Sequence, residues 1–230
     1  MFIRMLREDE PLDSVWEELV FTESRLRGDE QAKEFTPVVV NLIVRVDDVR
    51  SGQLSTRREE VAAQAAVGAA DDQLDDWIKA FDRALSDVVR GDKQSPRYRR
   101  YFMAAPWTFI RLGLESEVLR VRGWVDSLAT EPEQTLKDFG ARLAELITLG
   151  EAALEQRRKA VSARSDHRVR AITSLIEDVN AARGALYGNL ATKAGQAHLP
   201  LDWPSRFFKR SMRTPKAEDV PVPSPAPASS

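Results

Sequence analysis

Apolar residues recur along this chain at alternating gaps of three and four positions, which is the spacing of one face of an α-helix. The clearest segment has gaps of 4, 3, 4 and 3, between Leu74, Ile78, Phe81, Leu85 and Val88. A half-buried strand would instead alternate apolar and polar residues at every second position, and no segment does so. The spacing therefore predicts an all-α protein.

Composition limits the function classes. The 230 residues are 43% apolar and 30% charged, and a chain of this length can bury roughly 70% of its unfolded surface. The net charge is −2, so no global field steers the protein to nucleic acid or to an anionic membrane. The absence of Cys excludes disulfides and thiolate chemistry. No run approaches the roughly 20 apolar residues that span a bilayer, and we expect a cytoplasmic protein.

Helix start signals and a composition shift divide the chain into three parts. Residues 1–35 are predicted to be an N-terminal lead-in that contains one short helix. Thr36 followed by Pro37 is a strong helix start, and it opens a helical bundle domain over residues 36–213. Residues 214–230 are rich in Pro, Ala and Ser and are expected to be disordered, because such a composition cannot offset its ordering entropy.

Within the bundle domain the pattern predicts four to five long antiparallel helices, which would make an elongated bundle. Asp71 and Asp72 supply charge suited to a new helix N-terminus. A further helix is expected over residues 106–129. The apolar register fails beyond residue 161, and inserting three or four residues does not restore it, so a turn is expected over residues 162–166.

The last long helix carries a second stripe, of small residues, about 200° behind its apolar stripe. Glycine in a helix costs up to about 1 kcal/mol, so three glycines in one stripe favour close packing on a second face. We interpret the stripe first as packing inside the chain, against the alanine-rich residues 62–70. A seam for a second subunit and a frayed helix end are the alternatives. The candidate residues for helix-face interaction are Ala181, Gly184, Gly188, Ala191 and Gly195.

Arg183 occupies a position in the apolar stripe of the same helix, with Asn180 one turn before it and Tyr187 one turn after it. A buried guanidinium needs a partner, because an unpaired buried charge is very costly. A carboxylate from a neighbouring helix would serve, and an anionic ligand is the alternative. In a third interpretation only the aliphatic stem is buried.

Two short segments, residues 96–102 and 206–213, mix aromatic rings with arginine and lysine. Cations can neutralise phosphate while rings stack on bases, so these segments are candidates for nucleic-acid or polyanion binding. The other interpretation is that the rings close the ends of the bundle while the charges stay in water. The candidate anion-binding residues are Arg97, Arg99, Arg100, Arg206, Lys209 and Arg210.

No catalytic, metal or cofactor site is predicted. His167 and His198 are the two histidines, and neither has the Glu three residues earlier that a di-iron bundle requires. The sequence motifs HExxH, GxxxxGK[ST] and GxGxxG are absent. A helix start explains the acidic run better than a cation site does; the run consists of Asp71, Asp72, Asp75 and Asp76.

Three functional hypotheses follow, in order of support. The first is a non-enzymatic interaction or scaffold protein that acts through its helix faces on a protein partner or on a second copy of itself. The second is binding of nucleic acid or another polyanion through residues 96–102 and 206–213. The third is an enzyme without a recognisable motif.

Overall fold

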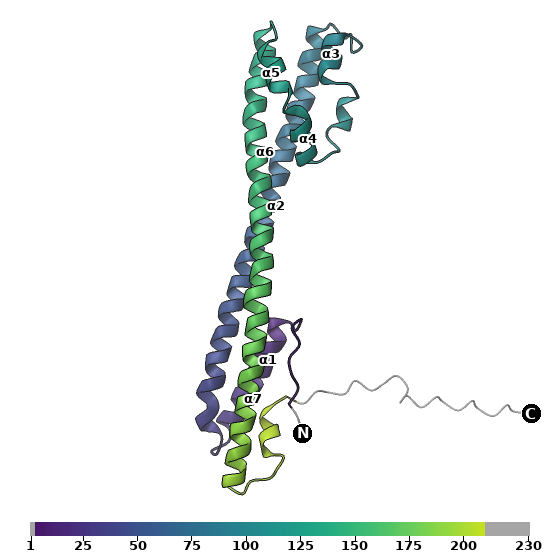
Figure 1. Ribbon diagram of the computed structural model, residues 1–230. Coiled ribbons are helices and arrows are strands. Elements are labelled where there is room, and N and C mark those ends of the chain that lie inside the picture. The colour runs from purple at the N-terminus through teal and green to yellow at the C-terminus, as the bar shows by residue number, and fades with distance from the viewer. Residues whose placement is uncertain (1–2, 210–230) are drawn as a thin grey trace, which may run out of the picture. The chain divides into compact units, whose positions relative to one another are not determined.

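The computed structural model describes residues 3–209, and every regular element in that range is a helix (Figure 1). The all-α prediction is therefore confirmed for the described part of the chain. In chain order the elements are α1 (Leu12–Arg27), η1 (Lys33–Phe35), α2 (Thr36–Val88), α3 (Pro96–Tyr101), η2 (Pro106–Thr108), α4 (Leu114–Val121), α5 (Trp124–Ala129), α6 (Gln134–His167), η3 (Arg168–Ile172), α7 (Thr173–Gln196) and η4 (Trp203–Phe207).

The helices form two compact units. Unit 2 is the single stretch Arg50–Ala171, and unit 1 contains the described residues on both sides of it. Unit 1 thus combines the lead-in of residues 1–35 with the two ends of the segment expected to form the bundle. The tail predicted to be disordered, residues 214–230, lies outside the described residues.

Helix α2 begins at Thr36, as expected, and continues for 53 residues. The helix start predicted at Asp71 and Asp72 is wrong, because both residues lie inside this helix. The alanine-rich residues 62–70 explain the continuity: alanine has the highest helix propensity, and the one interior glycine among them, Gly68, costs only about 1 kcal/mol.

The turn predicted over residues 162–166 is also wrong. Helix α6 passes through these residues, and the π-helical turn η3 joins it to α7 without a loop. A π-turn inserts one residue into an α-helix, and one residue is the insertion that the register needs. It moves the projected apolar positions from 171 and 174 to Ile172 and Leu175, both of which are buried.

The helix predicted over residues 106–129 is interrupted. It consists of η2, α4 and α5. Gly113, which precedes α4, has a φ of 76°, a left-handed conformation that glycine adopts without steric cost. This backbone conformation separates η2 from α4.

The core of unit 1 is formed by α1, the first part of α2, α7 and η4. Two ion pairs connect the α2 side to α7, Arg45 with Asp178 and Glu34 of η1 with Lys193. Residue numbers rise along one helix as they fall along the other, so α2 and α7 are antiparallel in this unit. The fully buried side chains here include Val15, Leu19, Leu26, Val46, Ile176, Val179 and Leu190.

The core of unit 2 contains α2 from residue 50 onward, α6 and the short helices between them. Its centre is aromatic, with Trp77 stacked on Phe81 at 4.9 Å and Trp124 edge-on to Phe102 at 5.2 Å between ring centroids. The indole Nε1 of Trp77 donates to the carbonyl of Phe139 at 3.2 Å, so the one polar atom of this ring is satisfied.

Towards Gly52 of α2 and His167 of α6 the contact between the two helices is formed by polar side chains. A Cβ at Gly52 would lie 2.6 Å from Cε1 of His167, and Glu60 pairs with Arg164 at 2.5 Å. Large apolar side chains of α2 stay in solvent in this region: Leu54 is 61% exposed and Val61 is 63% exposed. This part of α2 therefore has a free apolar face.

Gly140 provides a test of packing in unit 2. A Cβ at this position of α6 would lie 2.8 Å from Cβ of Leu128 in α5. We expect Gly140→Ala to lower the free energy of unfolding by about 1 to 3 kcal/mol, because the buried contact has no room for a methyl group. Urea unfolding monitored by circular dichroism measures the change.

Gly184→Ala is the matched control, because a Cβ at Gly184 meets nothing within 4 Å. Helix propensity should then raise stability by up to about 1 kcal/mol. Equal effects of the two substitutions would contradict the packing of α5 on α6.

Candidate functional site

The small-residue stripe of α7 faces solvent. All five members are exposed, and a Cβ built on any of its three glycines meets no atom within 4 Å. The interpretation that this stripe packs inside the chain is therefore wrong. The reason is geometric: the apolar stripe of α7 faces the core of unit 1, and a stripe about 200° away cannot face the same core.

Between residues 184 and 196 the exposed side of α7 also lacks charge, whereas Glu177 and Asp178 are exposed near the start of the helix. A solvated helix face normally carries charged residues, but those exposed between residues 184 and 196 are all uncharged. They are Gly184, Ala185, Gly188, Asn189, Ala191, Thr192, Gly195 and Gln196. The one charged residue in this stretch of sequence, Lys193, pairs with Glu34, and Arg183, just before the stretch, is buried.

Arg183 is buried, with 2% of its surface exposed, and it contacts a carboxylate of the neighbouring helix α1. Its Nη2 donates to Oε2 of Glu18 at 3.2 Å, and its guanidinium carbon lies 5.7 Å from the ring centroid of Phe208. Nε and Nη1 have no hydrogen-bond partner among the described residues. Burial lowers the pKa of Arg183, while the charge of Glu18 opposes that shift.

The neighbours of Arg183 on α7 are also held by the chain. The side-chain amide of Asn180 accepts from the backbone nitrogen of Leu6 at 2.8 Å and donates to its carbonyl at 2.9 Å. Tyr187 packs on Phe208, with ring centroids 6.0 Å apart. These contacts give the three polar residues a structural role, which is to attach the N-terminal segment and the residues after η4 to α7.

The cations of residues 96–102 are bound by the protein itself. Arg97 donates to Glu131 at 2.6 Å and also to Glu133, and these carboxylates raise its pKa. Arg100 lies 3.6 Å from Glu131, while Arg99 donates to a glutamine side chain. The rings of this segment are buried, namely Tyr98, Tyr101 and Phe102.

The described part of residues 206–213 follows the same pattern. Arg206 donates to both carboxylate oxygens of Asp202, at 2.9 and 3.1 Å, and Lys209 pairs with Glu17 at 3.1 Å. Phe207 and Phe208 are buried. The remaining candidate, Arg210, lies outside the described residues. Each described cation of the two segments therefore already has an acceptor within the chain.

Glu117 is a buried charged residue that is not among the candidate site residues predicted from the sequence. It projects from α4, is 0% exposed, and among the described residues neither carboxylate oxygen has a hydrogen-bond partner of ordinary geometry. Burial raises its pKa to about 7, and the charges of Asp75 and Asp71 add to the rise. Each of these aspartates, on α2, also has a buried unpartnered oxygen and a pKa raised mainly by burial.

A sequence signal for Glu117 did exist. Leu114, Glu117 and Val121 follow at gaps of three and four, so the glutamate falls on the core face of α4, as Arg183 does on α7. The acidic run that contains Asp71 and Asp75 predicts a helix start, which the structure does not contain. Within residues 3–209 no group of His, Asp and Glu side chains is arranged to hold a metal ion.

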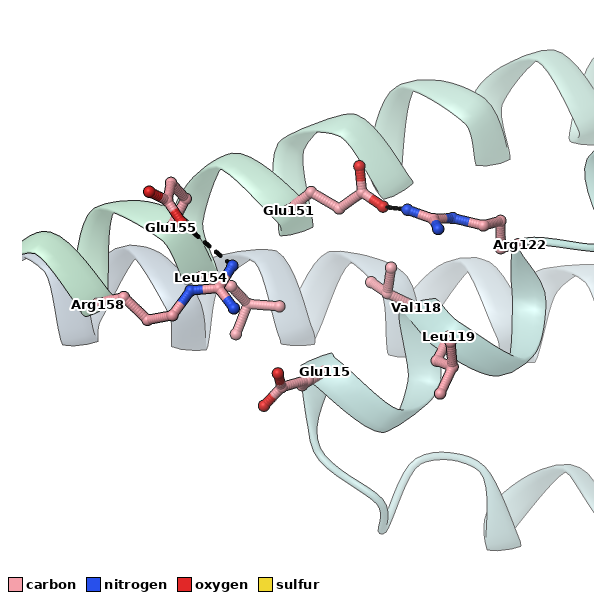
Figure 2. Close-up of a pocket in the computed structure, with 8 residues that line it drawn as sticks. All are labelled: Glu115, Val118, Leu119, Arg122, Glu151, Leu154, Glu155 and Arg158. Carbon is pink, nitrogen blue, oxygen red and sulfur yellow. Dashed lines mark hydrogen bonds and ion pairs between the residues drawn. The ribbon is translucent and has the colours of Figure 1, made fainter.

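A shallow groove of about 470 Å³ lies between α4 and α6 (Figure 2). Its apolar surface comes from Val118, Leu154 and the 73% exposed Leu119. Two ion pairs border it, Arg122 with Glu151 and Arg158 with Glu155, the second at 3.2 Å. The groove therefore has an apolar wall, and its charged lining consists of these two ion pairs and Glu115.

Glu117 predicts a specific pH dependence of stability. The ordinary pKa of glutamate is 4.5 and the folded value is about 7, so between these pH values the folded chain keeps a proton that the unfolded chain releases. Stability should therefore fall as the pH rises from about 4.5 to 7. Glu117→Gln, which cannot ionise, should raise the free energy of unfolding by about 3 kcal/mol at pH 8 and change it little at pH 4.5.

Urea unfolding at a series of pH values measures this difference. Glu115→Gln, on the same helix at an exposed position, is the matched control and should leave the profile unchanged. A wild-type profile that is parallel to that of Glu117→Gln would contradict the assignment.

The Arg183–Glu18 pair is tested by removing one partner and then both. Glu18→Leu leaves a buried guanidinium without its counter-ion, and we expect a loss of about 3 to 5 kcal/mol in stability. Adding Arg183→Met should recover most of that loss, because apolar side chains of similar volume can replace a buried ion pair at little cost. If the double variant is instead less stable than Glu18→Leu, the pairing is wrong.

Comparisons with known proteins do not supply a role for these residues. None of the helices in residues 3–209 is long and apolar enough to cross a membrane. No protein family, no curated protein and no solved structure matches the chain. The geometry described above is thus the basis for a proposal on function.

Proposed function

We propose that this chain is a non-enzymatic helical interaction protein that binds a protein partner through the exposed face of α7. The observation that carries the proposal is the exposed stripe of small uncharged residues Gly184, Gly188, Ala191 and Gly195. It is formed by a helix whose opposite side is anchored in the core of unit 1.

Three glycines in one exposed helical stripe are costly unless another chain packs on them. Each costs up to about 1 kcal/mol relative to alanine, and within residues 3–209 no atom lies within 4 Å of the positions where their Cβ atoms would be. A partner helix could approach the backbone of α7 very closely, because glycine and alanine present almost no side chain. The lack of charge on this face favours an apolar partner surface.

Binding of nucleic acid or another polyanion has less support. Four of its candidate cations, Arg97, Arg100, Arg206 and Lys209, are engaged by carboxylates of the chain, so a polyanion would have to displace these carboxylates. A titration with single-stranded nucleic acid at low and high salt tests this hypothesis, because phosphate contacts would make the affinity fall steeply with salt.

Gly188→Leu tests the proposed face directly. The leucine side chain replaces a glycine whose Cβ position has no atom of the described residues within 4 Å, so the protein should fold with equal or greater stability. It projects from the centre of the stripe and should prevent close approach of a partner. We expect proteins that co-purify with the wild-type chain from native lysate to be lost with this variant.

Asn189→Leu is the matched control, because Asn189 is exposed on α7 but lies about 100° around the helix from Gly188. It should retain the same co-purifying proteins. A set of bound proteins that is identical for the wild-type chain and for Gly188→Leu would refute the proposed face.

A further inference from the structure

The part of α2 that lies in unit 2 has an exposed face opposite its buried one. Val67 and Leu74 are buried, and residues about 180° around the helix from them are exposed. From residue 61 to 69 this exposed face is apolar and small. Its members are Val61, Ala62, Ala65, Gly68 and Ala69.

Opposite charges stand at the two ends of this face. Arg58 precedes Ala65 by seven residues, and Asp72 follows it by seven. Seven residues are close to two helical turns, so all three residues lie on the same side of α2. Both charged side chains are exposed, and no hydrogen bond or ion pair engages either of them among the described residues.

We propose that a second copy of this chain packs antiparallel on this face of α2, related by a two-fold axis that passes near Ala65. In such an isologous contact each residue a given distance before Ala65 meets the one the same distance after it. Arg58 of each copy then meets Asp72 of the other, and the pair forms twice. A parallel contact would place Arg58 against Arg58 and Asp72 against Asp72, which repel.

The steric pattern agrees with the same arrangement. Across the axis Val61 faces Ala69 of the second copy, and Ala62 faces Gly68, so each larger residue meets a smaller one. Gly68 has nothing within 4 Å of the position of a Cβ, which leaves room for the approaching helix. A shift of the register along the helix would break both charge pairs, so the ends of the face specify one alignment.

Charge reversal tests the pairing with the full-length chain. We expect a dimer by multi-angle light scattering, and Arg58→Asp and Asp72→Arg should each raise the dissociation constant about tenfold, because two attractive contacts become repulsive. The double variant restores both pairs and should dimerise as the wild type does. An equimolar mixture of the two single variants should form a heterodimer.

Arg142→Asp is the matched control, since Arg142 is exposed on α6 and pairs with Glu145 three residues away. It should not change the dissociation constant. Circular dichroism verifies that each variant is folded. A monomeric wild-type chain, or a dimer that the two reversals leave unchanged, would overturn the proposal.

A single cysteine locates the axis, because the chain has none of its own. Ala65→Cys should form an intermolecular disulfide on mild oxidation, since the two copies of residue 65 meet at the axis. Ser165→Cys, exposed on α6, should remain monomeric on a denaturing gel. Equal cross-linking of the two variants would overturn the axis.

The proposed dimer and the proposed role of α7 can each be refuted without the other. Gly188→Leu lies in unit 1, outside the α2 face, and should leave the dimer intact. A chain that binds partners through α7 but stays monomeric contradicts only the dimer, whereas a dimer that retains no partner contradicts only the proposed function.

Discussion

Burial of one face of α2 is the constraint on which both cores depend. A single helix of 53 residues provides Val46 to unit 1 and Leu74, Ile78 and Phe81 to unit 2, all of them fully buried. In unit 1 the antiparallel neighbour is α7, and in unit 2 it is α6. In each unit α2 buries one side, so its opposite side stays in solvent wherever no third element covers it.

The buried charged residues of the two units have different neighbours. In unit 1 the guanidinium of Arg183 meets a carboxylate of the opposite sign, so the cost of removing both groups from water is partly offset by their attraction. In unit 2 Glu117 lies near two more carboxylates, and the favourable state is the protonated one. The first arrangement joins elements of unit 1 together, and the second predicts that the stability of unit 2 depends on pH.

The exposed faces of α2 and α7 share one property. Each is a run of small uncharged residues on the side of a helix that is turned away from its own core, around Ala65 in one case and around Gly188 in the other. They differ at their ends, because the α2 face is bordered by charges of opposite sign at equal distances from its centre. That symmetry is the reason that we propose a second copy of this chain as the partner of the α2 face, and an apolar surface of another protein as the partner of the α7 face.

The Thr36–Pro37 start signal determined the start of α2. Periodicity determined the helical class and the burial of residues such as Leu85, because the spacing of apolar residues reports directly on which face of a helix is buried. It also singled out Arg183 as a charge on a core face. Glu117 could have been found by the same rule. Periodicity could not determine where a helix continues. A single extra residue at η3 shifts the apolar stripe without ending the helix. The acidic residues at 71 and 72 resemble a helix start, although α2 continues through them. The partners of the charged groups, and the exposure of the small-residue stripe on α7, were decided only by the tertiary structure, because both depend on which helices pack together and a single helix carries no information about its neighbours.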